Sequence, residues 1–173
     1  MQGTLERAKQ IKLIIFDVDG VLTDGGLYFD DSGQELKAFH SRDGLGMKML
    51  KSSGVEIGII TGRTSQVVTH RMNNLGIEHV YQGQSEKLPA FQLLIEKLGV
   101  SEREVAYVGD DVVDLPIMRR VGLAVAVQDA HDWVVKHAHW QTPSCGGRGA
   151  ARDICEFILE AQGNLESTLS QYL

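Results

Sequence analysis

Two acidic residues follow an apolar run near the start of the chain, in a pattern that suits phosphoryl or metal chemistry. Residues 13–16 (Leu-Ile-Ile-Phe) are apolar, and Asp17, Asp19 and Gly20 come next. Four strand-forming residues in a row predict a strand buried on both faces. Ligands of open α/β sheets bind beyond the carboxyl ends of the strands, so both carboxylates would stand at that crevice. They ionise together only beside a cation; otherwise one keeps a proton.

The pair therefore fits a magnesium site in which Asp17 attacks phosphorus and Asp19 transfers a proton. A calcium-binding EF-hand loop is the alternative for this spacing. Counted from Asp17, that loop would need an acidic or amide residue, a glycine and a glutamate at positions that hold Val21, Leu22 and Tyr28. The calcium alternative therefore fails on spacing.

More polar side chains follow the other expected strands. Thr61 comes after the expected strand 55–60, Lys87 comes shortly after 79–82, and Asp110 and Asp111 come after 105–108. The carboxyl ends of parallel strands meet in one crevice, so these groups would gather there with Asp17. A nucleophilic carboxylate, a metal-binding carboxylate, a hydroxyl and an ammonium group are what phosphoryl transfer requires, because that chemistry depends on positioning and on charge neutralisation.

Strand and helix patterns alternate along the chain, which predicts an α/β fold with a Rossmann-like, doubly wound parallel sheet. In chain order, helices are expected over 43–53 and over 64–75. Another should open at residues 83–87 and end at Gly99, and two more are expected near Pro116 and over about 130–137. A β-hairpin over about 26–39 is an insertion in this pattern, and its apolar residues should pack either on the same domain or on another subunit. A flexible glycine-rich loop and the last helix occupy about 144–163, and 163–173 are expected to be weakly ordered. Residues 1–173 should form one domain.

Composition limits the partners and the compartment. The chain has 17 basic and 23 acidic residues, a net charge of −6 and no basic run, so neither nucleic acid nor a membrane is an expected partner. An anionic substrate would need local positive charge. Cys145 and Cys155 are the only cysteines, and no apolar leader or membrane-length run occurs, so we expect a cytoplasmic protein.

Four segments in this order resemble the motifs of the haloacid dehalogenase superfamily: D-V-D-G-V-L-T-D from Asp17, T-G-R from Thr61, Lys87 near a helix start, and G-D-D-x-x-D from Gly109. The hairpin in place of a cap domain, with F-H-S-R-D-G, G-Q-S-E-K and G-G-R-G, is similar to a capless subgroup, the 3-deoxy-D-manno-octulosonate 8-phosphate (KDO 8-phosphate) phosphatases, from about residue 11 to 163.

The resemblance implies a Mg2+-dependent phosphatase of lipopolysaccharide biosynthesis that works as a homo-oligomer, with a tetramer expected. It implies that Asp17 becomes an aspartyl-phosphate and that Asp19 is the acid and base. Asp17, the backbone carbonyl of Asp19 and Asp110 would bind Mg2+, with Asp111 and Asp114 orienting them, while Thr61 and Lys87 bind the phosphoryl group. The substrate-binding residues that it implies are Asp19, His40, Ser41, Arg42, Asp43, Gly44, Lys48, Thr61, Gly62, Arg63, Arg71, Lys87 and Arg148.

Several alternatives stay open at this point. For Lys48 and Arg71, a solvated helix face is at least as good an explanation, and Arg148 could reach its own site or a neighbour's. The substrate could be another ulosonic acid phosphate. A phosphorelay receiver domain has similar residues in a different order, because its lysine comes last whereas Lys87 precedes Asp110. An inactive scaffold is disfavoured because competent residues fill every catalytic position.

Overall fold

Six parallel strands form the central sheet of the computed structural model, which describes residues 2–173. In sheet order they are β5 (His79–Tyr81), β4 (Glu56–Ile60), β1 (Leu13–Phe16), β6 (Val105–Gly109), β7 (Leu123–Ala126) and β8 (Trp140–Gln141). All neighbours pair in parallel, and the chain order reverses direction between β1 and β6. The predicted doubly wound α/β sheet is therefore confirmed, and its topological switch point lies beside Asp17.

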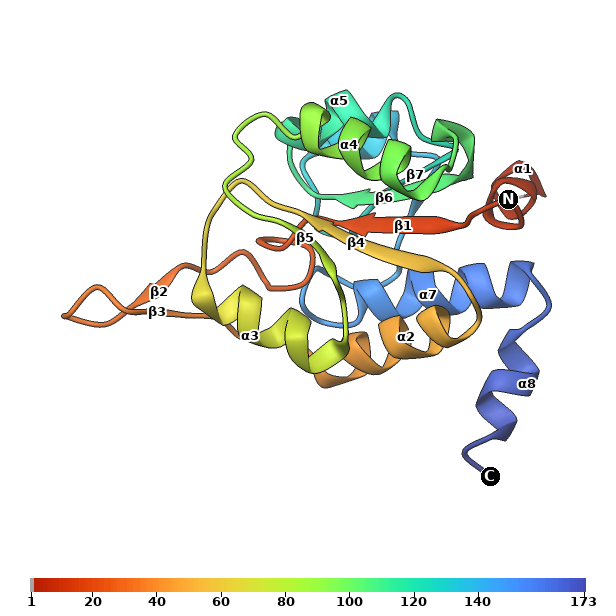
Figure 1. Ribbon diagram of the computed structural model, residues 1–173, viewed down its shortest axis with the longest axis horizontal. Coiled ribbons are helices and arrows are strands. Elements are labelled where there is room, and N and C mark those ends of the chain that lie inside the picture. The colour runs from red at the N-terminus through yellow and green to blue at the C-terminus, as the bar shows by residue number, and fades with distance from the viewer. Residues whose placement is uncertain (1) are drawn as a thin grey trace.

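Helices cover both faces of the sheet (Figure 1). One layer contains α2 (Ser41–Ser52), α3 (Gln66–Leu75) and α7 (Ala150–Ala161), and the other contains α4 (Leu88–Leu98), α5 (Leu115–Met118) and α6 (Asp132–His137). Each layer has its own hydrophobic cluster against the sheet, which explains why β1, β6 and β7 consist of buried residues throughout. Left-handed glycines, Gly76 and Gly99, end α3 and α4 as the sequence predicts.

The predicted hairpin is present, and it is smaller than expected. Its strands are β2 (Tyr28–Phe29) and β3 (Glu35–Leu36), which pair antiparallel and project from one end of the molecule (Figure 1). Leu27, Tyr28, Phe29 and Leu36 are all about half exposed or more. Packing on the same domain, one of the two sequence expectations, is therefore wrong for these four side chains, whereas Phe39 at the end of the predicted hairpin does pack against the core.

Three further elements differ from the sequence expectation. Helix α1 (Gln2–Ala8) and strand β8 were not predicted, because each is short and lacks a clear apolar period. Residues 163–173 were expected to be weakly ordered, whereas α8 (Leu165–Ser170) is helical and contacts α7. Short 3-10 turns, η1 (Glu102–Glu104) and η2 (Val112–Asp114), precede and follow β6. Within residues 2–173, no helix combines the length and apolar character that crossing a bilayer requires.

The glycine-rich loop packs against the segment that follows β1, which we call the Asp17 loop (residues 17–24). The N–H of Gly147 donates to the carbonyl of Val21 at 2.9 Å, and the N–H of Gly146 donates to Asp129 at 2.9 Å. A Cβ at Gly146 would stand 1.8 Å from the carbonyl oxygen of Gly20. The expectation of a flexible loop is therefore wrong: its glycines are needed for close backbone contact.

This contact predicts that Gly146→Ala destabilises the protein and lowers its activity, because neither backbone can move away freely. Overpacking of this kind costs about 1–3 kcal/mol of unfolding free energy. Denaturant titration monitored by circular dichroism measures the effect. Gly3→Ala is the matched control, because nothing lies within 4 Å of its added methyl group. Equal stability of the two variants would contradict the packing role.

Candidate active site

The Asp17 loop begins where β1 ends and turns sharply back on itself. The N–H of Asp17 still bonds to the carbonyl of Val108 in β6 at 3.1 Å, and the N–H groups of Leu22 and Thr23 both bond to the carbonyl of Val18. Asp17 is 7% exposed, and its Oδ1 accepts the N–H of Val18 at 2.7 Å. The loop therefore presents one carboxylate oxygen of Asp17 at the switch point.

A buried ammonium group balances the charge beside Asp17. Lys87 is the N-cap residue of α4, and its Nζ lies 2.9 Å from Asp17 Oδ2 and 2.7 Å from Asp114 Oδ1. Asp114 also accepts the hydroxyl of Tyr107 at 2.7 Å. Burial alone would lower the pKa of Lys87, but the Asp114 and Asp17 carboxylates raise it, so Lys87 stays charged.

Asp17, Asp110 and Asp114 each bring a carboxylate oxygen within 4.8 Å of the others. Asp114 is fully occupied, because its second oxygen accepts the N–H groups of Asp110 and Asp111 at 3.0 and 3.3 Å. Asp110 is different: its Oδ1 is buried and has no hydrogen-bond partner among residues 2–173. The unpartnered oxygen of Asp110 and the carboxylate of Asp17, each of whose oxygens accepts one hydrogen bond, fit a hard divalent cation, whereas Asp114 serves to orient its neighbours.

The close approach of these carboxylates raises the pKa values of two of them. Burial, followed by the negative charges of Asp114 and Asp17, raises the pKa of Asp110 to about 8. Burial and the Asp114 charge also raise the pKa of Asp17, although Lys87 opposes them. Gly20 allows this approach, because a Cβ on it would meet Asp110 Oδ2 at 2.1 Å. The site therefore concentrates negative charge that a cation would neutralise.

Thr61 and Asp19 complete the set of polar groups at this edge. Thr61 is buried directly after β4, where its N–H bonds to Tyr81 and its carbonyl accepts from Gln84. The carboxylate of Asp19 lies outside the cluster of three, because Lys37 of the hairpin segment binds its Oδ1 and Arg63 Nε lies 3.8 Å from its Oδ2. The contacts of the Asp19 carboxylate are therefore with Lys37 and Arg63 and not with the three clustered carboxylates.

Four of the residues implied for the sugar acid line one small cavity together: His40, Asp43, Gly44 and Arg71. Leu22 of the Asp17 loop forms part of its wall. His40 Nδ1 and Asp43 Oδ2 are buried there without partners among the described residues, but the cavity of about 10 Å³ has room for about one water molecule and not for a sugar. Arg71 stacks over the Phe39 ring with its Cζ at 5.8 Å.

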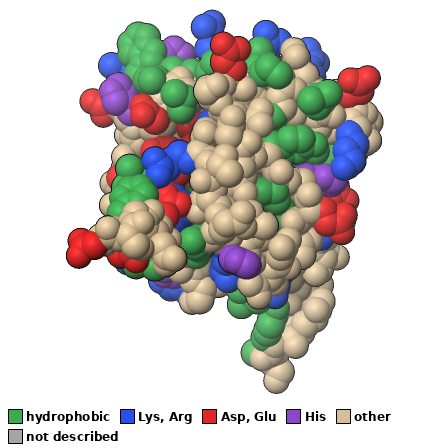
Figure 2. Space-filling model, turned by 60° about the vertical axis from the view of Figure 1, so that its left-hand side comes forward, with side chains coloured by type: hydrophobic (Ala, Val, Ile, Leu, Met, Phe, Trp, Pro, Cys, Tyr) green, Lys and Arg blue, Asp and Glu red, His purple; other side chains and the backbone are tan. Residues whose placement is uncertain are grey.

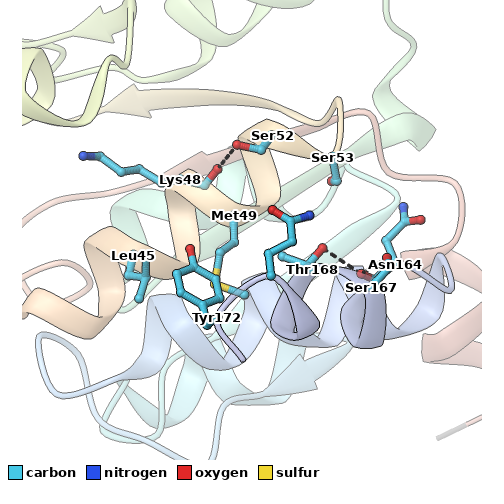
Figure 3. A pocket seen from close by; sticks show the side chains of 10 residues that line it. Leu45, Lys48, Met49, Ser52, Ser53, Asn164, Ser167, Thr168 and Tyr172 are labelled. Atoms are coloured by element: carbon cyan, nitrogen blue, oxygen red, sulfur yellow. Dashed lines mark hydrogen bonds between the residues drawn. The ribbon is translucent and has the colours of Figure 1, made fainter.

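Other residues implied by the resemblance lie elsewhere. Lys48 lines a groove between α2 and α8 with Met49 and Tyr172 (Figure 3), so the chain itself does not bring it to the carboxylates. Ser41 and Arg42 are exposed at the start of α2, and Gly62 is exposed next to Thr61. Arg148 forms an ion pair with Asp24 of the same chain, with its Nη2 3.1 Å from Asp24 Oδ2. Asp111 caps η2 by accepting the N–H of Val112.

Sequence reasoning missed three residues that contact the site: Lys37, Glu35 and Tyr107. Tyr107 is one polar group in a strand that otherwise reads as apolar, a signal that could have been noticed. Glu35 and Lys37 flank an apolar residue on the hairpin, and alternation would have put both on one face. Which face turns inward could not be read from the sequence.

Comparison with known proteins places these features in a family. The model of the haloacid dehalogenase-like hydrolases matches residues 76–153. The 3-deoxy-D-manno-octulosonate 8-phosphate phosphatase KdsC of Escherichia coli (strain K12) is 50% identical over 167 residues, which cover 96% of this chain and 89% of that protein.

Two solved structures are also similar. The 3-deoxy-D-manno-octulosonate 8-phosphate phosphatase from Yersinia pestis has a TM-score of 0.94 and 49% identity, covering 95% of this chain and 89% of that one. The phosphatase of the same name from Moraxella catarrhalis, in complex with magnesium ion, phosphate ion and KDO, has a TM-score of 0.98 and 41% identity, covering 100% of this chain and 99% of that one.

The raised pKa of Asp110 predicts a pH-dependent stability of the metal-free protein. The folded state binds this proton more tightly than the unfolded state, in which the pKa is 3.8, so the stability contribution is present at low pH and is lost as pH rises towards about 8. Thermal melts in chelator should therefore show a Tm that falls between pH 5 and 8. Asp110→Asn, which cannot titrate, should flatten this fall. Parallel profiles for the two proteins would contradict the assignment.

Proposed function

The chain belongs to the haloacid dehalogenase-like hydrolases, and from this membership we propose that it is a Mg2+-dependent phosphatase that hydrolyses KDO 8-phosphate to KDO and phosphate. The observation that carries the proposal is the buried cluster of Asp17, Asp110, Asp114 and Lys87 at the sheet's switch point. Sequence identity of 50% to a phosphatase of that name supports the substrate. We place the reaction in lipopolysaccharide biosynthesis and in the cytoplasm.

Asp17 is the nucleophile in this mechanism. A carboxylate oxygen of Asp17 attacks phosphorus, the bond from phosphorus to the sugar oxygen breaks, and an aspartyl-phosphate forms. Asp19 is the general acid that gives a proton to the departing sugar oxygen and then the base that removes one from water. That water attacks the phosphorus of the aspartyl-phosphate, which releases phosphate and restores the Asp17 carboxylate.

The remaining groups hold charge in place. Asp17, Asp110 and the backbone carbonyl of Asp19 would hold Mg2+, which supplies positive charge for the phosphoryl oxygens. Lys87 Nζ, held at 2.9 Å from Asp17, and the hydroxyl of Thr61 would bind those oxygens as well. Asp114 orients Lys87 and the backbone of Asp110 through hydrogen bonds that it accepts.

The sugar acid has a candidate site next to the Asp17 loop. The unpartnered His40 Nδ1 and Asp43 Oδ2 suit sugar hydroxyl groups, and Arg71 in the same cavity suits a carboxylate. Binding there requires the cavity of about 10 Å³ to open, because it has room for only about one water molecule. Arg63, 44% exposed near Asp19, adds a second guanidinium group. Lys48 lies too far along α2 for this role within one chain, and its place in the substrate site would require a neighbouring copy.

The first prediction from the proposed function concerns Asp17 and Asp19, the two aspartates of the Asp17 loop that take part in the mechanism. Asp17→Asn should abolish turnover and the binding of beryllofluoride with Mg2+, a mimic of the aspartyl-phosphate. Asp19→Asn should keep beryllofluoride binding and turn over about a hundredfold more slowly, the scale of acid and base catalysis. Steady-state assays and fluorine NMR measure the two effects. Normal turnover by Asp17→Asn would falsify the nucleophile assignment.

The second prediction concerns the substrate. In a panel of phosphorylated sugars with Mg2+, KDO 8-phosphate should exceed glucose 6-phosphate in kcat/KM by a factor of about a hundred or more, because arginines left without a carboxylate in the site are costly. Other ulosonic acid phosphates in the same panel test the alternative substrate. If simple phosphate monoesters were hydrolysed as fast as KDO 8-phosphate, the phosphatase assignment would still hold, but the assignment of a sugar-acid substrate would be wrong.

The third prediction concerns assembly. We propose a homo-oligomer, a tetramer, in which the apolar hairpin packs on a second copy, because its exposed leucines have no cover within residues 2–173. Leu27→Glu with Leu36→Glu should shift the mass measured by light scattering to that of a monomer. Leu93→Glu on α4, at a leucine of similar exposure, is the control. A wild-type monomer at micromolar concentration would contradict the proposal.

A further inference from the structure

A nearly inaccessible lysine on the hairpin segment contacts the acid and base of the proposed mechanism. The side chain of Lys37 is 1% exposed, and its Nζ pairs with Asp19 Oδ1 and, at 3.1 Å, with Glu35 Oε1. These two carboxylates are its acceptors among residues 2–173. Burying an ammonium group is unfavourable unless it is paired, so its exclusion from water fixes Lys37 between these carboxylates.

The same hairpin also holds Arg63. Glu35 Oε1 accepts from Arg63 Nη2 at 2.9 Å, and the Arg63 guanidinium lies over the Phe29 ring with its Cζ at 5.8 Å. Arg63 Nε in turn lies 3.8 Å from Asp19 Oδ2. Basic, acidic and hydrophobic side chains accordingly gather on the face from which the hairpin projects (Figure 2). Both oxygens of Asp19 therefore face cations whose positions depend on the hairpin.

We propose that Lys37, held by Glu35, is a positioning residue that fixes the orientation of the Asp19 carboxyl group for proton transfer to the departing oxygen. This inference rests on the proposed function. Lys37 makes no contact with Asp17 or Lys87 among the described ion pairs, so it acts through Asp19 and not on the phosphoryl group.

If Lys37 positions Asp19, the effect of removing Lys37 on the rate should depend on the leaving group. The proton moves from Asp19 to the oxygen that leaves phosphorus, while Asp17 forms the new bond to phosphorus. A departing oxygen that is stable as an anion needs little help from that proton, and a more basic one needs much. Loss of Lys37 should therefore slow substrates with basic leaving groups selectively, whereas general damage to the fold would slow all substrates alike.

The test compares wild type with Lys37→Met, which keeps the apolar stem and removes the charge. We measure kcat/KM on p-nitrophenyl phosphate, phenyl phosphate and KDO 8-phosphate with Mg2+, because kcat/KM includes the steps up to departure of the leaving group. The first two substrates have the same shape apart from the nitro group and lack a carboxylate, so differences between them do not depend on sugar binding.

For Lys37→Met we expect a loss of about tenfold or more on KDO 8-phosphate, found in kcat and with KM little changed, and a larger loss on phenyl than on p-nitrophenyl phosphate. Binding of beryllofluoride with Mg2+ should remain, which shows an intact fold and Asp17 site. Lys37→Arg, which keeps the positive charge, should recover part of the lost rate. Equal losses on all three substrates, or no loss, would overturn the role.

Two further variants separate the explanations. Glu35→Gln leaves Lys37 in place but removes its second anchor, and it should give the same leaving-group pattern more weakly. Asp31→Asn on the same hairpin is the matched control, because Asp31 forms no ion pair within residues 2–173, and it should match wild type. Absence of wild-type turnover of KDO 8-phosphate would contradict the proposed function, whereas wild-type turnover with an unselective Lys37→Met would contradict the role of Lys37 alone.

Discussion

The ion pair of Lys87 with Asp17 and Asp114 is the interaction on which the rest of the site depends. Three carboxylates approach one another within 4.8 Å in a place where little water reaches them. Without a cation they would repel one another or take up protons. The N-cap position on α4 brings Lys87 between two of them, and the loop from β5 to α4 sets that position. Removing one partner of such a buried pair typically costs about 3–5 kcal/mol.

Two aspartates of the cluster differ in what their oxygens can still do. Asp114 accepts four hydrogen bonds, from Lys87, Tyr107 and two backbone N–H groups. Its orientation is therefore fixed, and neither of its oxygens is available to a further ligand. Asp110 keeps a buried oxygen without a partner, and burial together with the charges of Asp114 and Asp17 raises its pKa. A cation-dependent enzyme needs both kinds of carboxylate: one that orients the neighbouring residues and one that can coordinate the ion.

The sequence predicted the parts of this arrangement that follow from sheet topology. Asp17, Lys87 and Asp110 could be brought together in advance because parallel strands end at one edge of the sheet. The contacts of Lys37 and Gly146 could not, since they depend on the path of irregular segments. For Lys48 two alternatives were open, because it lies two turns into α2 and the helical period alone does not tell how far a residue lies from the sheet's edge.

The hairpin therefore meets two physical demands at once. Its charged residues, Glu35 and Lys37, turn inward to Asp19 and Arg63, whereas Leu27 and Leu36 remain exposed. Two strands of two residues each are too short to be stable alone, so the ion pairs at the base and any partner on the outside must share in fixing them. In the proposed assembly, a second copy that covers the leucines would also shield these ion pairs from water and strengthen them. Oligomerisation and the orientation of Asp19 would then be coupled through one small element.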